Sequence, residues 1–340
     1  MTHRTRTLLL APLLLAVGCS GDDEPEPEKL LDTGWFTDTA ALATKGEDCP
    51  HRFVSSSPAG GETRWYYRDR PYAFVATDST DQYEAWLVDG GGRRLETEMV
   101  WRDGNVAFDL AWEGLLEPST DYTLWMKDCA TTESITFTTS ELGAPIEGGP
   151  GSLVGNTWRL DLVGATWVEP GALAGLLAVY FSTPILLGVQ YADSANIDFI
   201  GAPGYIDELG RVRQDVKPTW DFPVQSFAQQ PYFEAEVSSI DIVYVDQTTE
   251  FTIPVQDFRL YASIAPDGES LGGARLSGLA DTRYMGSLVP GGGDEGSVCE
   301  LAQTLGVNCV TCDDGQPYCL YLEAEDLDGS LVDDVSIIPF

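Results

Sequence analysis

The chain has 340 residues, and its 54 Asp and Glu outnumber its 19 Lys and Arg to give a formal net charge of −35. A surface this acidic repels polyanions, so we exclude nucleic acid as a partner. A content of 43% hydrophobic and 11% aromatic residues is typical of packed globular domains rather than of disordered chains. The length suggests two domains.

Residues 1–18 have the layout of a secretory signal peptide. Arg4 and Arg6 precede an apolar run from Leu8 to Val17, and a basic start followed by a short apolar core is typical of an export signal. The run of about ten residues is too short for a membrane-spanning helix, which needs about 20. We therefore predict a cleaved lipoprotein-type signal peptide over 1–18.

The residues around the predicted cleavage site resemble a lipid attachment signal. Leu15, Val17, Gly18 and Cys19 match the lipobox of bacterial lipoproteins. The resemblance implies that Cys19 becomes the diacylglycerol-modified first residue, and acyl chains of this kind attach a protein stably to a membrane. By the same resemblance, Ser20 after the cysteine implies the outer membrane. An ordinary signal peptide followed by a stray cysteine is the alternative.

An acidic, proline-containing stretch over 19–47 predicts an extended tether. It is followed by short runs of alternating polar and apolar residues that continue to Leu142. Turn signals separate these runs, for example at Gly90–Gly92 and Asp103–Asn105. Several short strands at this spacing predict a β-sandwich over 48–142.

Three stretches of this region, "VSSSPAGGET", "LLEPSTDYTLWM" and "ITFTTSEL", resemble a bacterial Ig-like domain of the surface-layer-protein type. Leu116, Pro118, Thr120 and Tyr122 match the L-x-P-x-T-x-Y stretch of that family. The resemblance implies a tyrosine corner, in which the buried Tyr122 hydroxyl satisfies a backbone group where the chain enters the next strand.

The region departs from the family in its abundance of tryptophan. We interpret these side chains first as sandwich core, because buried tryptophan is common. A patch that binds a glycan or a protein partner is the alternative. The residues concerned are Trp65, Trp86, Trp101, Trp112 and Trp125.

A Gly- and Pro-rich linker over 143–152 leads into a second domain over 153–340. Residues 171–192 carry no charge. We predict a buried helical segment that ends near Phe181 and a strand from Ile185, with a lid over a hydrophobic cavity as the alternative. The expected fold is mainly all-β: an N-terminal Ig-like β-sandwich followed by a second antiparallel β-rich domain with one hydrophobic helical segment. This half is similar to C-terminal regions of uncharacterised lipoproteins of myxobacterial type, which implies no function.

Six cysteines besides Cys19 indicate three disulfides in an exported protein. They are Cys49, Cys129, Cys299, Cys309, Cys312 and Cys319. A Cys49–Cys129 bridge would clamp the sandwich by about 4 kcal/mol in the chain-entropy model. The last four have the spacing C-x9-C-x2-C-x6-C, which also suits zinc. We favour two disulfides because exported thiols are oxidised, and three pairings stay open.

The sequence predicts no catalytic residue, no metal site and no cofactor. His51 is the only histidine after the signal peptide and is expected at the surface, and we find no nucleophile elbow, P-loop or dinucleotide-binding motif. Residues 323–334 resemble a calcium loop in Asp326 and Asp328, but Ala324 and Val335 fall on the anchoring positions. We predict a solvated acidic turn there. A carboxylate-pair hydrolase is the enzymatic alternative.

Together these features predict a non-enzymatic envelope protein. Cys19 would anchor it to the outer membrane, and the Ig-like domain would act as a spacer or as a module that binds a protein or glycan partner. The alternative is a carrier of a lipid or another hydrophobic ligand in the second domain, motivated by the uncharged residues 171–192.

Overall fold

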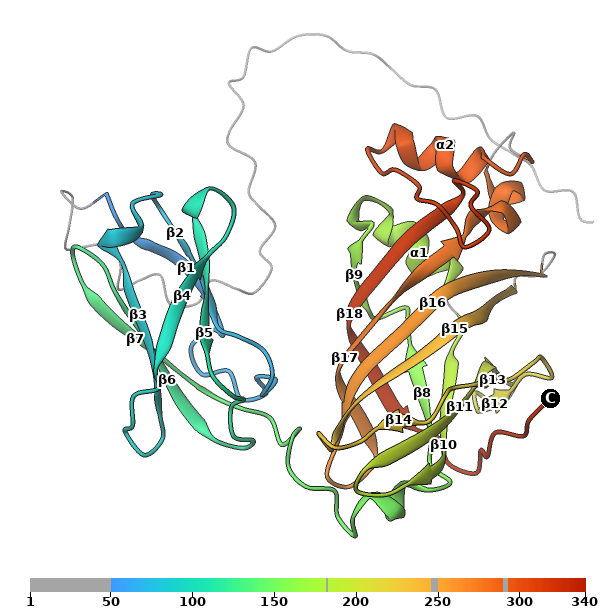
Figure 1. Ribbon diagram of the computed structural model, residues 1–340, viewed down its shortest axis with the longest axis horizontal. Helices are drawn as coiled ribbons and strands as arrows, with labels where there is room; N and C mark the ends of the chain where they lie inside the picture. Colours follow the sequence, from blue (N-terminus) through green and yellow to red (C-terminus); the bar gives the residue numbers. More distant parts are fainter. Residues whose placement is uncertain (1–49, 182, 246–249, 290–292) are drawn as a thin grey trace, which may run out of the picture. The chain divides into compact units, whose positions relative to one another are not determined.

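The computed structural model describes residues 50–181, 183–245, 250–289 and 293–340 (Figure 1). The predicted signal peptide, Cys19, the tether and Cys49 lie outside the described residues. Residues 46–340 form one compact unit, and two large hydrophobic cores lie within it. No helix in the described ranges is both long and apolar enough to cross a membrane.

The first core lies in a β-sandwich, drawn in blue to green in Figure 1. The strands pair antiparallel in the orders β1-β2-β5-β4 and β3-β6-β7. These orders are the ABED and CFG sheets of a constant-type Ig domain, so the fold is Ig-like. The strands are β1 (Phe53–Ser57), β2 (Tyr72–Val75), β3 (Glu84–Asp89), β4 (Thr97–Trp101), β5 (Ala107–Trp112), β6 (Asp121–Lys127) and β7 (Thr132–Thr138).

Tyr122 forms the predicted corner at the start of β6. Its side chain is 3% exposed, and its hydroxyl accepts a hydrogen bond of 2.9 Å from the Glu117 backbone N–H. Burial of the ring raises the pKa of the phenol above its usual range. The neutral hydroxyl therefore holds the preceding turn in place, as the motif predicts.

The loop between β1 and β2 (residues 58–71) covers the outer edge of β7. The backbone N–H of Gly61 donates to the carbonyl of Thr136 at 2.8 Å, and that of Thr138 donates to Glu62 at 2.7 Å. Farther along, the Trp65 N–H donates to Thr138 at 3.2 Å, and Trp65 pairs in parallel with Thr139. The loop therefore satisfies backbone groups of Thr136 and Thr138 at the C-terminal end of this edge.

The second core lies inside a large antiparallel sheet with the order β12-β11-β10-β8-β18-β17-β16-β15; β13 and β14 also pair with β11, and β9 pairs with β18. β14 contacts β15, so the two ends of the sheet approach each other and the sheet is curled. The strands are β8 (Thr157–Asp161), β9 (Thr166–Glu169), β10 (Ile185–Ala192), β11 (Asn196–Ile206), β12 (Val212–Gln214), β13 (Trp220–Asp221), β14 (Gln225–Ser226), β15 (Tyr232–Val245), β16 (Glu250–Ile264), β17 (Ser270–Asp281) and β18 (Cys319–Leu331).

The uncharged segment folds as predicted into a helix and a strand. Helix α1 (Ala174–Tyr180) is followed by β10 from Ile185. Leu177 and Phe181 are almost wholly buried in the second core, and the Phe181 ring lies 5.3 Å from that of Trp167. The other α-helix, α2 (Ser297–Thr304), precedes the cysteine-rich loop. Short 3-10 helices are η2 (Thr80–Gln82), η3 (Asp103–Asn105), η4 (Pro150–Leu153), η5 (Gly171–Leu173) and η6 (Thr282–Leu288).

The predicted acidic turn at 323–334 is wrong for most of its length, because β18 continues through it to Leu331. Ala324 and Leu327 of this segment are buried in the second core, and the burial of these apolar side chains outweighs the acidic composition. Asp326 between them has a φ of 55° where the register against β17 shifts. The strand therefore carries a local bulge at the point that resembled a turn.

Candidate functional site

The four C-terminal cysteines form two disulfides, Cys299–Cys309 and Cys312–Cys319. The first bond ties α2 to the loop that follows it, and the second ties that loop to the start of β18. Cys129 is also disulfide-bonded, and its partner lies outside the described residues. All four C-terminal sulfurs are therefore bonded in pairs, so none of them is a free thiolate that could coordinate zinc.

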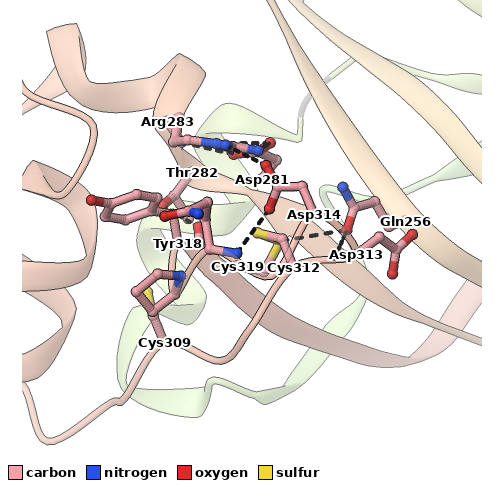
Figure 2. The surroundings of a disulfide bond; sticks show 12 residues. Gln256, Asp281, Thr282, Arg283, Cys309, Cys312, Asp313, Asp314, Tyr318 and Cys319 are labelled. Carbon is pink, nitrogen blue, oxygen red and sulfur yellow. Dashed lines mark hydrogen bonds and ion pairs between the residues drawn. A yellow bond between two sulfur atoms is a disulfide. The ribbon is translucent and has the colours of Figure 1, made fainter.

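An ion-pair cluster holds the Cys312–Cys319 loop to the end of β17 (Figure 2). Arg283 donates from Nε to Asp281 at 2.8 Å and from Nη1 to Asp314 at 2.6 Å. The Asp281 side chain is 3% exposed. Hydrogen bonds to Asp281 and Asp314 raise the pKa of the guanidinium further above its usual range. The guanidinium and both carboxylates of the cluster have partners, so we interpret the cluster as a structural support of this loop.

The five tryptophans divide between the core and the surface. Trp65 is buried in the sandwich core, and Trp101 and Trp112 pack against that core. The core interpretation is wrong for Trp86 and Trp125. Their strand neighbours Ala85, Leu87, Leu124 and Met126 face the core, so the alternation of β3 and β6 turns both tryptophans outward.

These two outward tryptophans form a cross-strand pair. Trp86 and Trp125 lie directly opposite each other, with ring centroids 6.0 Å apart and ring planes within 4° of parallel. The Arg94 guanidinium lies 4.7 Å from the Trp86 ring centroid. Stacking of this kind stabilises the sheet and places a half-buried aromatic pair on its outer face.

His51 is half-buried rather than fully at the surface. Its Nδ1 lies 2.6 Å from the Thr77 hydroxyl, and its ring meets the Tyr83 ring edge-on at 6.2 Å. His51 is thus partly exposed, and these two contacts fix its imidazole against the sandwich.

A contact surface that the sequence does not predict joins the β1–β2 loop to the curled sheet. The hydroxyls of Tyr66 and Tyr67 lie 2.8 and 3.2 Å from the hydroxyl of Ser263 on β16. Ser263 is wholly buried. Burial raises the pKa of Tyr66 well above its usual range. One serine hydroxyl is therefore the shared hydrogen-bond partner of both phenols.

An ion pair lies beside these tyrosines. Asp69 accepts a hydrogen bond of 3.0 Å from Arg275 on β17, and Arg275 also pairs with Glu325 at 3.3 Å. Burial of Asp69 raises the pKa of its carboxyl to about 6, while Arg275 opposes the shift. Asp69 is therefore a carboxyl that gains a proton at mildly acidic pH.

Arg68 is held in place but is not fully satisfied. Its guanidinium lies 3.6 Å from the centroid of the Tyr232 ring, and its Nη2 donates to Gln229 at 3.2 Å. Its Nη1 is buried and has no hydrogen-bond partner among the described residues. A buried donor without a partner is uncommon and requires an explanation.

These residues surround a pocket of about 340 Å³, which we call the seam pocket. The pocket combines phenol rings, two guanidinium groups and two carboxylates, so it offers hydrogen-bond donors, acceptors and aromatic faces to a polar ligand. Groups with perturbed pKa values in a pocket mark a candidate site. It is lined by Tyr66, Arg68, Asp69, Tyr232, Tyr261, Gly273, Arg275, Leu276, Ser277 and Glu323.

No family model matches the chain, and no curated protein matches it. Two crystal structures of the uncharacterized protein lmo2446 from Listeria monocytogenes align with 66% of this chain at 10% sequence identity, with TM-scores of 0.17 and 0.18. The alignment spans only 21% of the Listeria chain. A likeness this weak supports no conclusion about this chain.

Proposed function

We propose that this chain is a non-enzymatic, lipid-anchored binding protein of the bacterial outer membrane. In this proposal Cys19 carries the lipid, residues 19–47 hold the folded unit away from the bilayer, and the folded unit presents a binding surface. The lipobox-like residues that end at Cys19 and the acidic tether support the anchoring part.

The observation that carries the proposal is the pair of disulfides at the C-terminal end of the unit. Stable disulfides are typical of oxidising compartments and are rare in the cytosol. Cys299–Cys309 and Cys312–Cys319 therefore support export independently of the signal-like N-terminus.

The contacts around Ser263 support presentation by a rigid unit rather than by loosely linked domains. The β1–β2 loop is fixed to β16 and β17 by two tyrosine hydroxyls and by the Asp69–Arg275 ion pair. A ligand pocket enclosed by such a contact needs little reorganisation to bind.

The carrier hypothesis gains no support from the position of α1. Leu173, Leu177 and Phe181 are packed into the second core. Pockets that described residues line elsewhere in the chain, such as the seam pocket, do not include 171–192. We therefore interpret the uncharged segment as a structural part of the curled sheet.

Membrane fractionation tests the anchoring. We expect the wild-type protein in the outer-membrane fraction and a Cys19→Ala variant in the soluble periplasmic fraction. A Ser20→Ala variant is the matched control and should remain with the membranes. A Cys19→Ala protein that still fractionates with membranes would overturn the lipid-anchor proposal.

Thiol labelling tests the export. In the unfolded but unreduced protein, the four C-terminal cysteines should resist alkylation, and all four should react after reduction. Ready labelling without reductant would contradict an oxidising compartment.

A further inference from the structure

Arg68, which lines the seam pocket, carries a hydrogen-bond donor that no described residue satisfies. Its Nη1 is buried without a partner in the described part of the chain, although the same guanidinium is positioned by Gln229 and Tyr232. A charged donor that stays unpaired after burial costs free energy, and native proteins retain few such groups. A positioned donor of this kind points to an acceptor supplied by a ligand.

Acceptors line the same pocket. Glu323 accepts one hydrogen bond of 3.3 Å from the Tyr321 hydroxyl, and a carboxylate has about four lone-pair positions. The Ser277 hydroxyl adds a group that both donates and accepts. A ligand that accepts from Arg68 and donates to Glu323 would therefore match the pocket.

The charges in the pocket favour a neutral ligand. Arg275 is paired with Asp69, which leaves the opposite charges of Arg68 and Glu323 to balance each other. The net charge of the whole chain, −35, opposes the accumulation of anions. Hydroxyl groups satisfy both Arg68 and Glu323 without adding charge, because each hydroxyl donates and accepts.

The walls and the size favour a small ring that has both polar and apolar faces. The rings of Tyr66, Tyr232 and Tyr261 and the side chain of Leu276 line the pocket. Its volume of about 340 Å³ lies at the small end of ligand pockets, which span about 300–1,000 Å³. A single sugar ring has C–H faces for the phenol rings and hydroxyls for the charged groups.

We infer that the seam pocket binds one neutral sugar unit, with Arg68 donating to one ring hydroxyl and Glu323 accepting from another. The inference rests on the proposed role as a binding protein, and it names the class of ligand. It does not depend on the lipid anchor, because every residue used lies in the folded unit. The sugar is either free or the end of a larger glycan.

Titration of the full chain tests the inference. The Cys19→Ala protein, purified from the periplasm, is titrated with glucose, galactose, mannose and N-acetylglucosamine by calorimetry and by saturation-transfer NMR. We expect at least one sugar to bind with a Kd on the order of 1 mM or tighter. Arg68→Gln and Glu323→Gln should each weaken that binding by about tenfold or more.

Matched controls separate this pocket from the tryptophan pair. Trp125→Ala and Arg94→Gln change the half-buried tryptophan pair and its exposed arginine, which do not line the seam pocket, and should leave sugar affinity unchanged. Sugar binding that is lost in Trp125→Ala but kept in Arg68→Gln would overturn the inference, and so would the absence of binding by all four sugars. Displacement of the sugar by glycine would also overturn it, by showing that the pocket selects a zwitterion.

Two further measurements keep the outcomes distinct. If Arg68→Gln fails to fold, Glu323→Gln alone carries the test, because Glu323 lies outside the contacts that fix the β1–β2 loop. A glycan chip probed with the same protein distinguishes a free sugar from a glycan end. A Cys19→Ala protein that still fractionates with membranes would refute the lipid-anchor proposal without affecting the sugar result.

Discussion

The ring of Tyr66 lies against the backbone of Gly273, so close that a Cβ added to Gly273 would stand 2.3 Å from the ring. Gly273 has a φ of 57° and lies where the register of β17 against its neighbour β18 shifts. Gly272, the preceding residue, lies equally close to Leu142: a Cβ added to Gly272 would stand 2.3 Å from the Leu142 side chain. Two adjacent glycines thus make the recess in which the sandwich side chains sit.

Replacing Gly273 with alanine should therefore destabilise the protein by about 2 kcal/mol or more, because a φ in the left-handed region costs about 1 kcal/mol and Tyr66 must also move. Gly210→Ala is the matched control, because Gly210 has a φ of 75° and a Cβ added there would meet no atom within 4 Å. Denaturant unfolding measures both. Equal losses in the two variants would contradict the role of the Tyr66 contact.

Ser263→Ala should cost about 1–3 kcal/mol of unfolding free energy, because it leaves the hydroxyls of Tyr66 and Tyr67 without their shared partner. Thermal or denaturant unfolding provides the measurement. Ser226→Ala removes an exposed hydroxyl and should change the stability little. A Ser263→Ala protein as stable as the wild type would show that water replaces the serine.

The raised pKa of Asp69 predicts a pH dependence with a definite sign. The folded protein holds a proton on Asp69 up to a pH of about 6, whereas the ordinary pKa is 3.8. The folded state therefore binds more protons in this interval, and the contribution of Asp69 to stability falls as the pH rises through it. Glu325, Asp326 and Glu62 raise the same pKa and Arg275 lowers it.

Asp69→Asn isolates this effect, because the amide is neutral at every pH. The wild type should lose stability relative to Asp69→Asn as the pH increases from 4 to 6, and the difference should become constant only well below the ordinary pKa of 3.8. Urea unfolding at a series of pH values measures it. A difference that does not change with pH would mean that Asp69 titrates normally.

Arg283→Gln should destabilise the cysteine-rich end by roughly 2–3 kcal/mol, because it leaves the buried Asp281 carboxylate without its cationic partner. The double variant Asp281→Asn, Arg283→Gln should recover part of that loss, since no buried charge remains unpaired. Arg93→Gln breaks an exposed pair with Asp89 and serves as the control. If the double variant were as unstable as Arg283→Gln, the loss would come from packing rather than from charge.

Local patterns in the sequence predict much of the fold. The alternation of apolar residues predicts the strands of the sandwich, and the Tyr122 motif predicts the corner that the structure contains. The uncharged run from 171 divides into α1 and β10 near Phe181, as its Pro184 and the adjoining polar residues indicate. Each of these features depends on neighbours in the sequence, which is why it can be inferred from the sequence alone.

The features that the sequence does not reveal depend on distant partners. Tyr66 and Ser263 are 197 positions apart, so no local pattern links them. The only local signal is the dense aromatic and charged stretch "RWYYRDR" at 64–70, which is unusual for a loop. The outward position of Trp86 and Trp125, by contrast, can be read from the local sequence. The buried Leu87 and Leu124 are their neighbours in the strands, and side chains of adjacent strand residues point to opposite faces.

The β1–β2 loop also covers part of a strand edge. An open strand edge invites pairing with another chain. Residues 61–65 occupy the edge of β7 before the same loop reaches Ser263 and Gly273. A loop that is displaced from Gly273 would therefore uncover part of this strand edge and open the seam pocket at the same time, so one segment of chain closes both.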